Sequence, residues 1–383
     1  MKKIIYIIND LKIGGSTKAL FRIISNSKFN SRHIVISLNR NDSNHNLLKL
    51  QENFDFYFID WSSFNKLLFS IFNLTKILKK EKNSILHCWL YKSCLIGWIL
   101  SLIFGNKHVI WNIRHADLSL NFKQIKKYFL IKVLQVISNT NLKRINIIYN
   151  SNFSQKVHLN FGFPKRKGIV ITNGFDTDKY IFNKNMKDKF LNKFNIKNDV
   201  FLISMYARFH PIKNHKILFE AIEHILVRHP NIHIFLAGRF INEKNKKLKN
   251  YINNYNLKNK ITFGGLLNEE ELLSSYSATE LTILTSLSES FPNVIGESMA
   301  CSTPCISSDV GDCKAIIGNS GWITKTNNIN DLILKIEKAI KLYEDKTQWR
   351  KLQDNCRKRI LDYHSIKIEV ENYKNLENLL SIN

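Results

Sequence analysis

Acidic residues are scarce in this sequence of 383 residues. Thirty-one Asp and Glu stand against 57 Lys and Arg, which gives a formal net charge of +26. The excess is uneven, since residues 1–180 carry a net +19 and residues 181–383 a net +7. Such a surplus suggests an anionic partner for the first half: a membrane, a nucleic acid or a phosphorylated substrate. A general residue bias explains it equally well, because 45 of the 57 basic residues are Lys.

A membrane-spanning run is also missing. The best apolar stretch, Ser93–Phe104, has 12 residues, well short of the roughly 20 that a spanning helix needs. The apolar run at the start stops at Asn9 and Asp10, so we predict no secretory signal peptide. The six cysteines fit neither a zinc nor a disulfide spacing, which favours buried, reduced thiols in a cytosolic protein.

Apolar strand patterns alternate with helical patterns along the whole chain. In the first half we predict strands at Lys3–Ile8, His33–Leu38, Phe56–Ile59, Ser84–Cys88, His108–Ile113 and Ile145–Asn150, and helices at Ser16–Ile24 and Leu67–Leu78. In the second half we predict strands at Val200–Met205, Asn231–Ala237, Ile261–Phe263, Leu281–Leu284 and Pro304–Ser307, and helices at Asn214–His229, Asp331–Leu342 and Gln348–Asp362. Continuous apolar strands between helices predict an α/β fold of two doubly wound, Rossmann-like domains.

The domain boundary is expected in the polar, Lys-rich segment that begins with the turn signal Asn173-Gly174. This gives an N-terminal domain of residues 1–178 and a C-terminal domain of residues 179–363. A helix of about residues 364–383 can pack back on the first domain. Two doubly wound domains of this kind face each other with the carboxyl ends of their strands across a cleft.

The dinucleotide fingerprint G-x-G-x-x-G is absent. Instead, Gly14 and Gly15 follow the first predicted strand and precede a helix. Two glycines allow a close backbone approach, and the amides at a helix N-terminus can bind a phosphate. A tight turn without a ligand is the alternative interpretation.

Two cations follow the predicted strand Val200–Met205 at its carboxyl end: Arg208 and Lys213. Separated by a turn at Pro211, a guanidinium and an ammonium can bind a diphosphate from two sides. Two solvated loop cations would give the same spacing.

The segment from Glu289 to Glu297 follows the predicted strand Leu281–Leu284. Pro292 suits the first turn of a helix, which leaves the amides near Phe291–Val294 for sugar hydroxyls or phosphate oxygens. The two glutamates are spaced for two parts of one ligand, although exposed glutamates are common.

Two further candidates are weaker by themselves. His115 ends the predicted strand His108–Ile113 and can hydrogen-bond a substrate group, or serve a structural role. Asp176 and Asp178 match the Asp-x-Asp pattern that often holds a divalent metal with a nucleotide. They lie in a polar turn without a third ligand, so we predict no metal site.

In combination, these motifs resemble glycosyltransferase family 4, the retaining nucleotide-sugar transferases of GT-B fold. The resemblance runs along nearly the whole chain and rests on residues 8–15, 149–151, 171–176, 207–213, 289–301 and 309–312. The segment Trp111–His115 also resembles the branch that builds bacterial surface polysaccharides such as O-antigen and capsule. Ser302 departs from the family, which usually has glycine at that position.

The resemblance implies roles for these residues. Arg208 and Lys213 neutralise the donor diphosphate, Glu297 holds the ribose hydroxyls, Glu289 holds the donor sugar, and His115 lies near it. The implied donor-binding set is Gly14, Gly15, Arg208, Lys213, Gly265, Leu266, Glu289, Phe291, Pro292, Asn293, Val294 and Glu297, and the implied catalytic set is His115, Arg208, Lys213 and Glu289. The family needs no metal and no cofactor besides the nucleotide sugar, for which UDP is favoured over GDP.

The acceptor side is expected in the N-terminal domain. Asn121–Leu134 interleaves lysines with apolar residues, as a basic amphipathic helix for an anionic bilayer does. Trp89, Trp98 and Ser93–Phe104 would extend this membrane face, although the last segment also fits a core helix. The two donor-binding cations lie in the less basic half, so the net +19 falls on the acceptor domain.

We therefore expect a cytoplasmic enzyme, peripherally associated with the inner face of the cytoplasmic membrane, that transfers a sugar to a lipid-linked glycan acceptor. A non-catalytic nucleotide-sugar-binding subunit beside an active partner is the alternative. Nucleic-acid binding has only the charge in its favour, because no reader module appears in the sequence.

Overall fold

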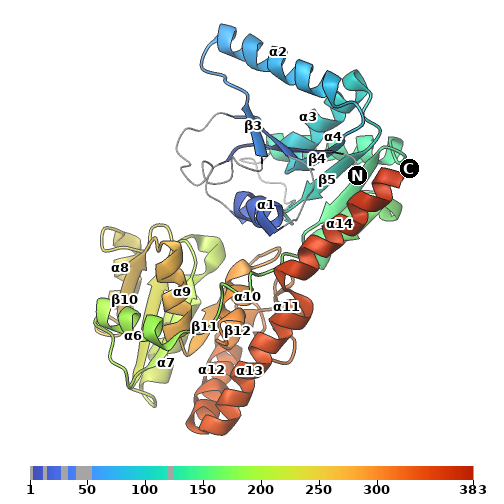
Figure 1. The fold of residues 1–383 in the computed structure, drawn as a ribbon. Coiled ribbons are helices and arrows are strands. Elements are labelled where there is room, and N and C mark those ends of the chain that lie inside the picture. Colours follow the sequence, from blue (N-terminus) through green and yellow to red (C-terminus); the bar gives the residue numbers. More distant parts are fainter. Residues whose placement is uncertain are drawn as a thin grey trace. The chain divides into compact units, whose positions relative to one another are not determined.

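The computed structural model describes residues 3–11, 15–26, 33–39, 54–116, 118 and 125–382. The chain divides into two compact units: residues 1–174 with 366–383 form unit 1, and residues 175–365 form unit 2. Each unit holds one parallel sheet with helices around it (Figure 1). The predicted α/β class with two doubly wound sheets is confirmed.

Unit 1 is built on a seven-stranded sheet in the order β3-β2-β1-β4-β5-β6-β7. Its strands are β1 (Ile4–Ile8), β2 (His33–Ser37), β3 (Phe54–Phe58), β4 (Ile85–Trp89), β5 (Val109–Ile113), β6 (Ile145–Tyr149) and β7 (Gly168–Val170). Its helices are α1 (Gly15–Asn26), α2 (Phe64–Lys80), α3 (Tyr91–Phe104), α4 (Ile125–Thr140), α5 (Asn152–Asn160) and α14 (Ile366–Ile382). Strand β1 is buried along its whole length, as expected for a central strand covered on both faces.

Different helices cover the two faces of the unit 1 sheet. Ile5 and Ile7 of β1 share a core cluster with buried side chains of α2, α3 and α4. Ile4, Tyr6 and Ile8 share another cluster with buried side chains of α1 and α14. The C-terminal helix therefore packs on the N-terminal sheet (Figure 1).

Unit 2 is built on a six-stranded sheet in the order β10-β9-β8-β11-β12-β13. Its strands are β8 (Phe201–Tyr206), β9 (Ile232–Ala237), β10 (Ile261–Gly265), β11 (Leu281–Leu284), β12 (Cys305–Ser308) and β13 (Gly321–Thr324). Its helices are α6 (Lys184–Lys193), α7 (His215–Leu226), α8 (Lys246–Asn254), α9 (Glu269–Ala278), α10 (Asn293–Ala300), α11 (Cys313–Ile317), α12 (Ile329–Glu344) and α13 (Lys346–Tyr363).

The chain passes from one unit to the other twice, and both crossings lie next to the contact that Phe175 makes with His364 and Ser365. The amide of Phe175 donates to the carbonyl of His364 at 2.7 Å, and Phe175 forms an isolated parallel bridge with Ser365. Phe175 is fully buried in unit 2. The crossings thus lie at 174/175 and 365/366, a few residues from the predicted 178/179 and 363/364, because Phe175 is a core residue of unit 2.

Some expectations need correction. Trp89, predicted in a membrane face, is fully buried and stacks on Tyr373 of α14 with ring centroids 6.5 Å apart. Strands β7 and β13 were not predicted, because both are short and begin with a glycine, which is depleted in strands. The first four residues of the predicted helix Asn121–Leu134 lie outside the described residues, and α4 begins at Ile125.

All six cysteines are buried and free of disulfide bonds, as predicted. Within the part of the chain that the structure describes, no helix combines the length and the apolar character required to cross a bilayer.

Candidate functional site

Most of the predicted donor residues of unit 2 lie at the point where the strand order reverses. From β8 the chain continues to β9 and β10 on one side of the sheet, whereas β11, β12 and β13 extend on the other side. In open parallel sheets, ligands bind beyond the carboxyl ends of the two strands that flank such a switch point. Arg208 and Lys213 follow β8, and Glu289 follows β11.

The loop after β8 brings Lys213 back over the sheet edge. Arg208 is exposed. Pro211–Lys213 forms one 3₁₀ turn, whose N-terminal amide at Ile212 donates to the imidazole of His210 at 3.3 Å. Asn214 adopts a left-handed backbone with φ of 50° and starts α7. This turn fixes the position of the Lys213 side chain.

The loop after β11 is tied to the loop after β8. The hydroxyl of Thr285 donates to the carbonyls of Lys213 and Asn214 at 3.0 Å each. The amide of Leu287 donates to the carbonyl of Ile212 at 2.8 Å. The two loops therefore hold each other in place through backbone groups that no local sequence pattern reveals.

Lys213 and Glu289 meet between these loops. The Lys213 ammonium forms an ion pair with Oε1 of Glu289, and the two side chains are only 20% and 14% exposed. Ser286 donates its hydroxyl to the same carboxylate oxygen at 2.6 Å. Gly311, with φ of 56°, lies so close that an added Cβ would be 2.6 Å from the carbonyl oxygens of Glu289 and Ser290. Ser286 was not predicted as a site residue. Its position three residues before Glu289 is the only local sequence feature that could have indicated it.

Helix α10 begins directly after this cluster. Pro292 is its N-cap residue and provides no side-chain cap, so the amides of the first turn, at Asn293 and Val294, receive no side-chain cap from that residue. The Phe291 side chain is buried and stacks on Phe175 with ring centroids 6.2 Å apart. Phe291 and Pro292 therefore shape the backbone at the start of α10.

Glu297 lies in the second turn of α10 and is held by a residue that sequence analysis missed. The buried hydroxyl of Tyr276, from α9, donates to Oε2 of Glu297 at 2.8 Å. Burial, followed by the nearby Glu297 carboxylate, raises the pKa of Tyr276 well above its usual value. Tyr276 therefore stays protonated and orients the carboxylate. No motif spacing links positions 276 and 297.

Gly265 is the last residue of β10 and Leu266 follows it, two strands from β8 in the same sheet. Gly265 has φ of 62°, and its carbonyl accepts the amide of Gly238 at 2.7 Å. Leu266 is 75% exposed. These residues share the carboxyl edge of the sheet with Arg208 and Lys213.

Two predicted residues lie in unit 1. Gly15 is the first residue of α1, and no atom of the described residues lies within 4 Å of the place that its Cβ would take. His115 is exposed just after β5, and its carbonyl accepts the hydroxyl of Ser154 at 2.9 Å. Gly14 lies outside the described residues.

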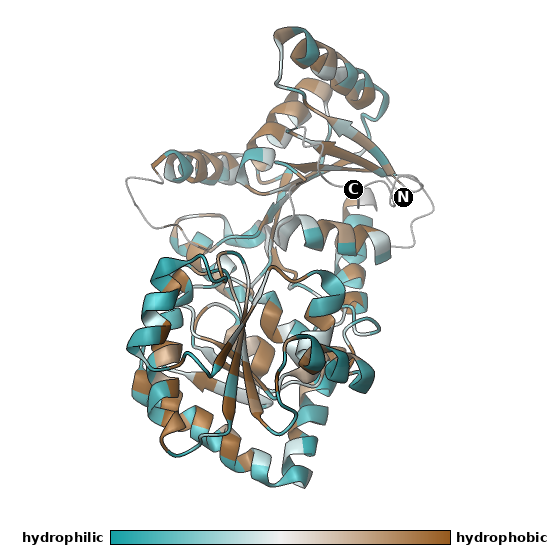
Figure 2. Ribbon diagram, turned by 90° about the vertical axis from the view of Figure 1, so that its left-hand side faces the viewer, coloured by the Kyte–Doolittle hydropathy of each residue, from teal (hydrophilic) through white to brown (hydrophobic). Residues whose placement is uncertain are grey.

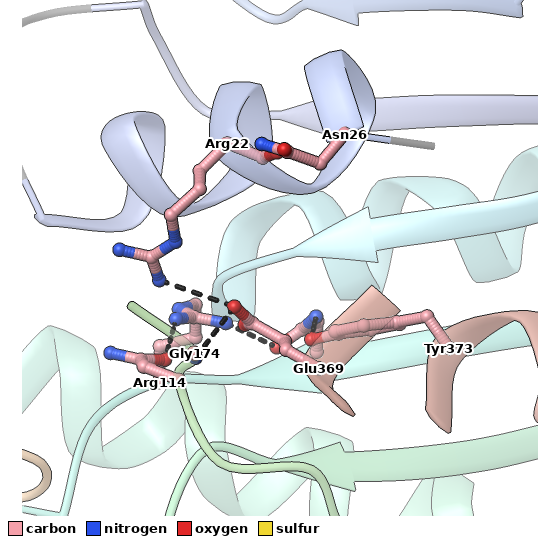
Figure 3. Close-up of polar contacts among 8 residues, drawn as sticks. Arg22, Asn26, Arg114, Gly174, Glu369 and Tyr373 are labelled. Atoms are coloured by element: carbon pink, nitrogen blue, oxygen red, sulfur yellow. Dashed lines mark hydrogen bonds and ion pairs between the residues drawn. The ribbon is translucent and has the colours of Figure 1, made fainter. Parts of the chain in front are cut away.

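A buried polar network anchors the loop that carries His115 (Figure 3). The adjacent Arg114 is buried, donates to the side chain of Asn173, and lies 4.7 Å from the Trp89 ring centroid. Glu369 of α14 accepts the amide of Gly174 at 2.7 Å and a guanidinium N–H of Arg22 at 3.3 Å. Burial raises the pKa of Glu369, although Arg22 and Arg114 oppose that shift.

The Asp-x-Asp pattern has a local structural role. Oδ1 of Asp176 accepts the amides of Asp178 and Lys179 at 3.2 and 3.1 Å. This is the hydrogen bonding of a polar turn, and it accounts for Asp176 without a ligand.

Comparison with known proteins gives the class. Residues 186–358 match the family "Glycosyl transferases group 1". A UDP-Gal:alpha-D-GlcNAc-diphosphoundecaprenol alpha-1,3-galactosyltransferase of Escherichia coli is 27% identical over 316 residues, which cover 80% of this chain and 78% of that protein. The crystal structure of Anabaena HepE in complex with UDP-glucose has a TM-score of 0.81 at 19% identity and covers 99% of this chain and 100% of that one. A lipopolysaccharide outer core galactosyltransferase, WaaB, has a TM-score of 0.68 at 17% identity, with 97% and 98% covered.

The family match and the relatives support a glycosyltransferase that uses a nucleotide sugar, and the predicted GT-B architecture is confirmed. The chain is a glycosyltransferase, and its residues 186–358, within unit 2, match the glycosyl transferases group 1.

Proposed function

We propose that this enzyme transfers a hexose from a UDP-sugar, with retention of configuration, to a lipid-linked glycan acceptor in bacterial surface polysaccharide synthesis. One observation carries the proposal: Lys213 and Glu289 meet at the switch point of the unit 2 sheet, where the loop after β8 also carries Arg208. This is where a nucleotide diphosphate sugar finds both cations for its phosphates and a carboxylate for its hydroxyls.

The chemistry follows from charge. Sugar transfer passes through an oxocarbenium-like state while negative charge grows on the departing diphosphate. Arg208 and Lys213 stabilise that charge at fixed positions, and the amides at the start of α10 add partial positive charge. A bound diphosphate competes with Glu289 for the Lys213 ammonium. Glu289 is then available to accept hydrogen bonds from the sugar hydroxyls.

Glu297 is proposed to hold the ribose. Its carboxylate is fixed on one side by the Tyr276 hydroxyl at 2.8 Å and is partly exposed. A carboxylate accepts two hydrogen bonds per oxygen, so vicinal ribose hydroxyls can bind the remaining positions. Gly265 and Leu266 would then border the base, and we also propose Gly15 and His115 as donor-binding residues.

The acceptor assignment rests on the relatives. The galactosyltransferase of Escherichia coli acts, by its name, on a diphosphoundecaprenol-linked sugar. An acceptor of this kind places the enzyme at the cytoplasmic face of a membrane, and the basic N-terminal half is suited to an anionic surface. We propose no metal and no nucleic-acid partner.

The test is a donor panel. The protein is incubated with UDP-, GDP- and ADP-sugars, a polyprenyl-diphosphate-linked monosaccharide and EDTA, and nucleoside diphosphate and glycolipid are measured. We expect UDP release that depends on the acceptor, and a product that keeps the anomeric configuration of the donor by NMR. Binding of a UDP-sugar without turnover would instead indicate a non-catalytic subunit. An inverted product would contradict the retaining assignment.

A further inference from the structure

Helix α2 exposes an apolar stripe to its surroundings. Phe64, Leu68, Ile71 and Phe72 are 73%, 49%, 43% and 65% exposed. Their spacing of four, seven and eight positions places them on one side of the helix. Of the 17 residues of α2, only Leu74 and Leu78 are buried. An exposed apolar stripe of this size marks a contact surface, because single exposed apolar residues do not line up in this way.

The first turns of α2 pack loosely on the sheet. A cavity of about 440 Å³ lies between α2 and the carboxyl end of β3, with Phe58, Phe69 and Leu74 in its lining. The buried side chains of the helix, Leu74 and Leu78, come from its second half, and from the first half Leu67 packs on the core while partly buried. The first half of α2 thus contacts the core of unit 1 less than the second half does, and α2 lies at the margin of this unit (Figure 1).

The neighbouring helices on this face of the sheet also carry exposed apolar residues, and the helices of unit 1 include many hydrophobic positions (Figure 2). On α3, Leu102 and Ile103 are 50% and 66% exposed, and on α4, Phe129 and Val136 are 64% and 53% exposed. Helices α2, α3 and α4 all contribute to the same core cluster, so they form one layer over one face of the sheet. We call these three helices the apolar layer.

The charge of the apolar layer has one sign. Its helices contain eight lysines and not one Asp or Glu. Lys66, Lys76, Lys79 and Lys80 of α2 are exposed. Lysines that flank an apolar stripe can extend to the phosphates of lipid headgroups while the apolar side chains enter the acyl region. A soluble protein partner would not require the complete absence of acidic residues from three helices.

We propose that the apolar layer docks on an anionic phospholipid bilayer, with the Phe64, Leu68, Ile71 and Phe72 stripe of α2 inserted below the headgroups. The proposal deepens the proposed function, since it names the surface that brings the enzyme to a lipid-linked acceptor. It also adds apolar insertion by α2 to the membrane face that the sequence predicted at Asn121–Leu134 and Ser93–Phe104. Anionic lipid then contributes through the eight lysines of the layer.

The experiment is vesicle flotation of the full-length protein, without any sugar substrate. Vesicles of phosphatidylcholine alone are compared with vesicles that contain 30% phosphatidylglycerol. The wild type is expected to float with the anionic vesicles. The triple variant Phe64→Ser, Leu68→Ser, Phe72→Ser is expected to lose at least about tenfold in partition coefficient. Val227→Ser in unit 2, where the apolar side chain is 84% exposed, should behave as the wild type.

A second variant separates charge from insertion. Lys76→Gln, Lys79→Gln, Lys80→Gln should weaken binding to anionic vesicles severalfold and flatten its salt dependence. Equal flotation of the wild type and the Phe64/Leu68/Phe72 variant would overturn the proposal. So would a wild-type dimer in light scattering that this variant converts to a monomer, because the stripe would then serve a second copy of the chain.

The proposed function is tested by a separate measurement of sugar transfer. UDP release with a short-chain, water-soluble acceptor should be the same in the wild type and in the variants of α2, which also reports that they are folded. Normal vesicle binding without sugar transfer would refute the proposed function alone. Normal transfer without vesicle binding would refute only the docking proposal.

Discussion

The Lys213 ammonium pairs with the Glu289 carboxylate, although 76 positions separate the two residues in the chain and they follow different strands. In the proposed mechanism, Lys213 binds the diphosphate and Glu289 binds the donor sugar, so this ion pair joins the two parts of the donor site. Because Ser286 also donates to Oε1 of Glu289, we expect the carboxylate to keep its position if a phosphate binds the Lys213 ammonium instead.

Replacement of Lys213 should therefore affect catalysis and not folding. We expect Lys213→Met to lower kcat about 10²–10³-fold, because one fixed cation is lost where charge develops on the leaving diphosphate. Steady-state UDP release is the measurement. Lys216→Met, an exposed lysine on α7, is the matched control. A Lys213→Met enzyme with the wild-type kcat would remove this residue from the diphosphate site.

The Tyr276–Glu297 hydrogen bond should matter for donor binding more than for the chemical step. Tyr276→Phe removes one donor to the carboxylate at 2.8 Å, and hydrogen bonds to charged groups contribute about 1.5–3 kcal/mol. We expect the donor KM to rise about tenfold with kcat nearly unchanged. Tyr363→Phe, on an exposed side chain, is the control. A loss confined to kcat would place Glu297 at the reacting sugar instead of at the ribose.

Substitution of two glycines should distinguish a glycine that is needed for packing from one that is needed for ligand binding. A Cβ at Gly296 would overlap the ring of Phe175, so Gly296→Ala should destabilise unit 2 by about 1–3 kcal/mol. A Cβ at Gly15 meets no described atom within 4 Å. Gly15→Ala should therefore keep the wild-type melting temperature and still reduce donor turnover, if a ligand approaches this backbone. An unchanged melting temperature together with full activity would make Gly15 a simple turn residue.

The stability of unit 1 should depend on pH through Glu377. Burial raises the pKa of Glu377 to about 8, and burial lowers the pKa of His87, 3.7 Å away, to about 3. Both side chains are therefore uncharged in the folded protein at neutral pH. The unfolded chain releases the Glu377 proton near pH 4.5, so stability is lost as the pH rises toward 8, by up to about 1.4 kcal/mol per pH unit.

Glu377→Gln should remove this dependence. Buried histidines act in the opposite direction below about pH 6.5, so the wild type and the variant are compared by urea unfolding between pH 6.5 and 8. The variant should gain relative stability as the pH rises. Glu371→Gln, an exposed position on the same helix, should follow the wild type. Parallel curves for the wild type and Glu377→Gln would mean that Glu377 is ionised in the folded state.

The donor motifs could be placed from sequence because each belongs to one strand end. Arg208 follows β8 and Glu289 follows β11 within a few residues, and strands such as Ile4–Ile8 are apolar throughout because both faces are buried. The residues that hold the motif side chains were not predictable. Tyr276 looks like any helical tyrosine until α9 and α10 bring its hydroxyl to Glu297.

By itself, the sequence determined two parallel-sheet units, the order of their elements and the strand ends that carry the donor residues, since alternation of apolar runs and turns is a local property. Only the tertiary structure decided which distant residues meet. The strand order of unit 2 places the loops after β8 and β11 side by side, and that order depends on packing across the whole sheet. The same holds for unit 1, where the C-terminal helix returns to the N-terminal sheet because buried Glu369, Tyr373 and Glu377 find their partners there.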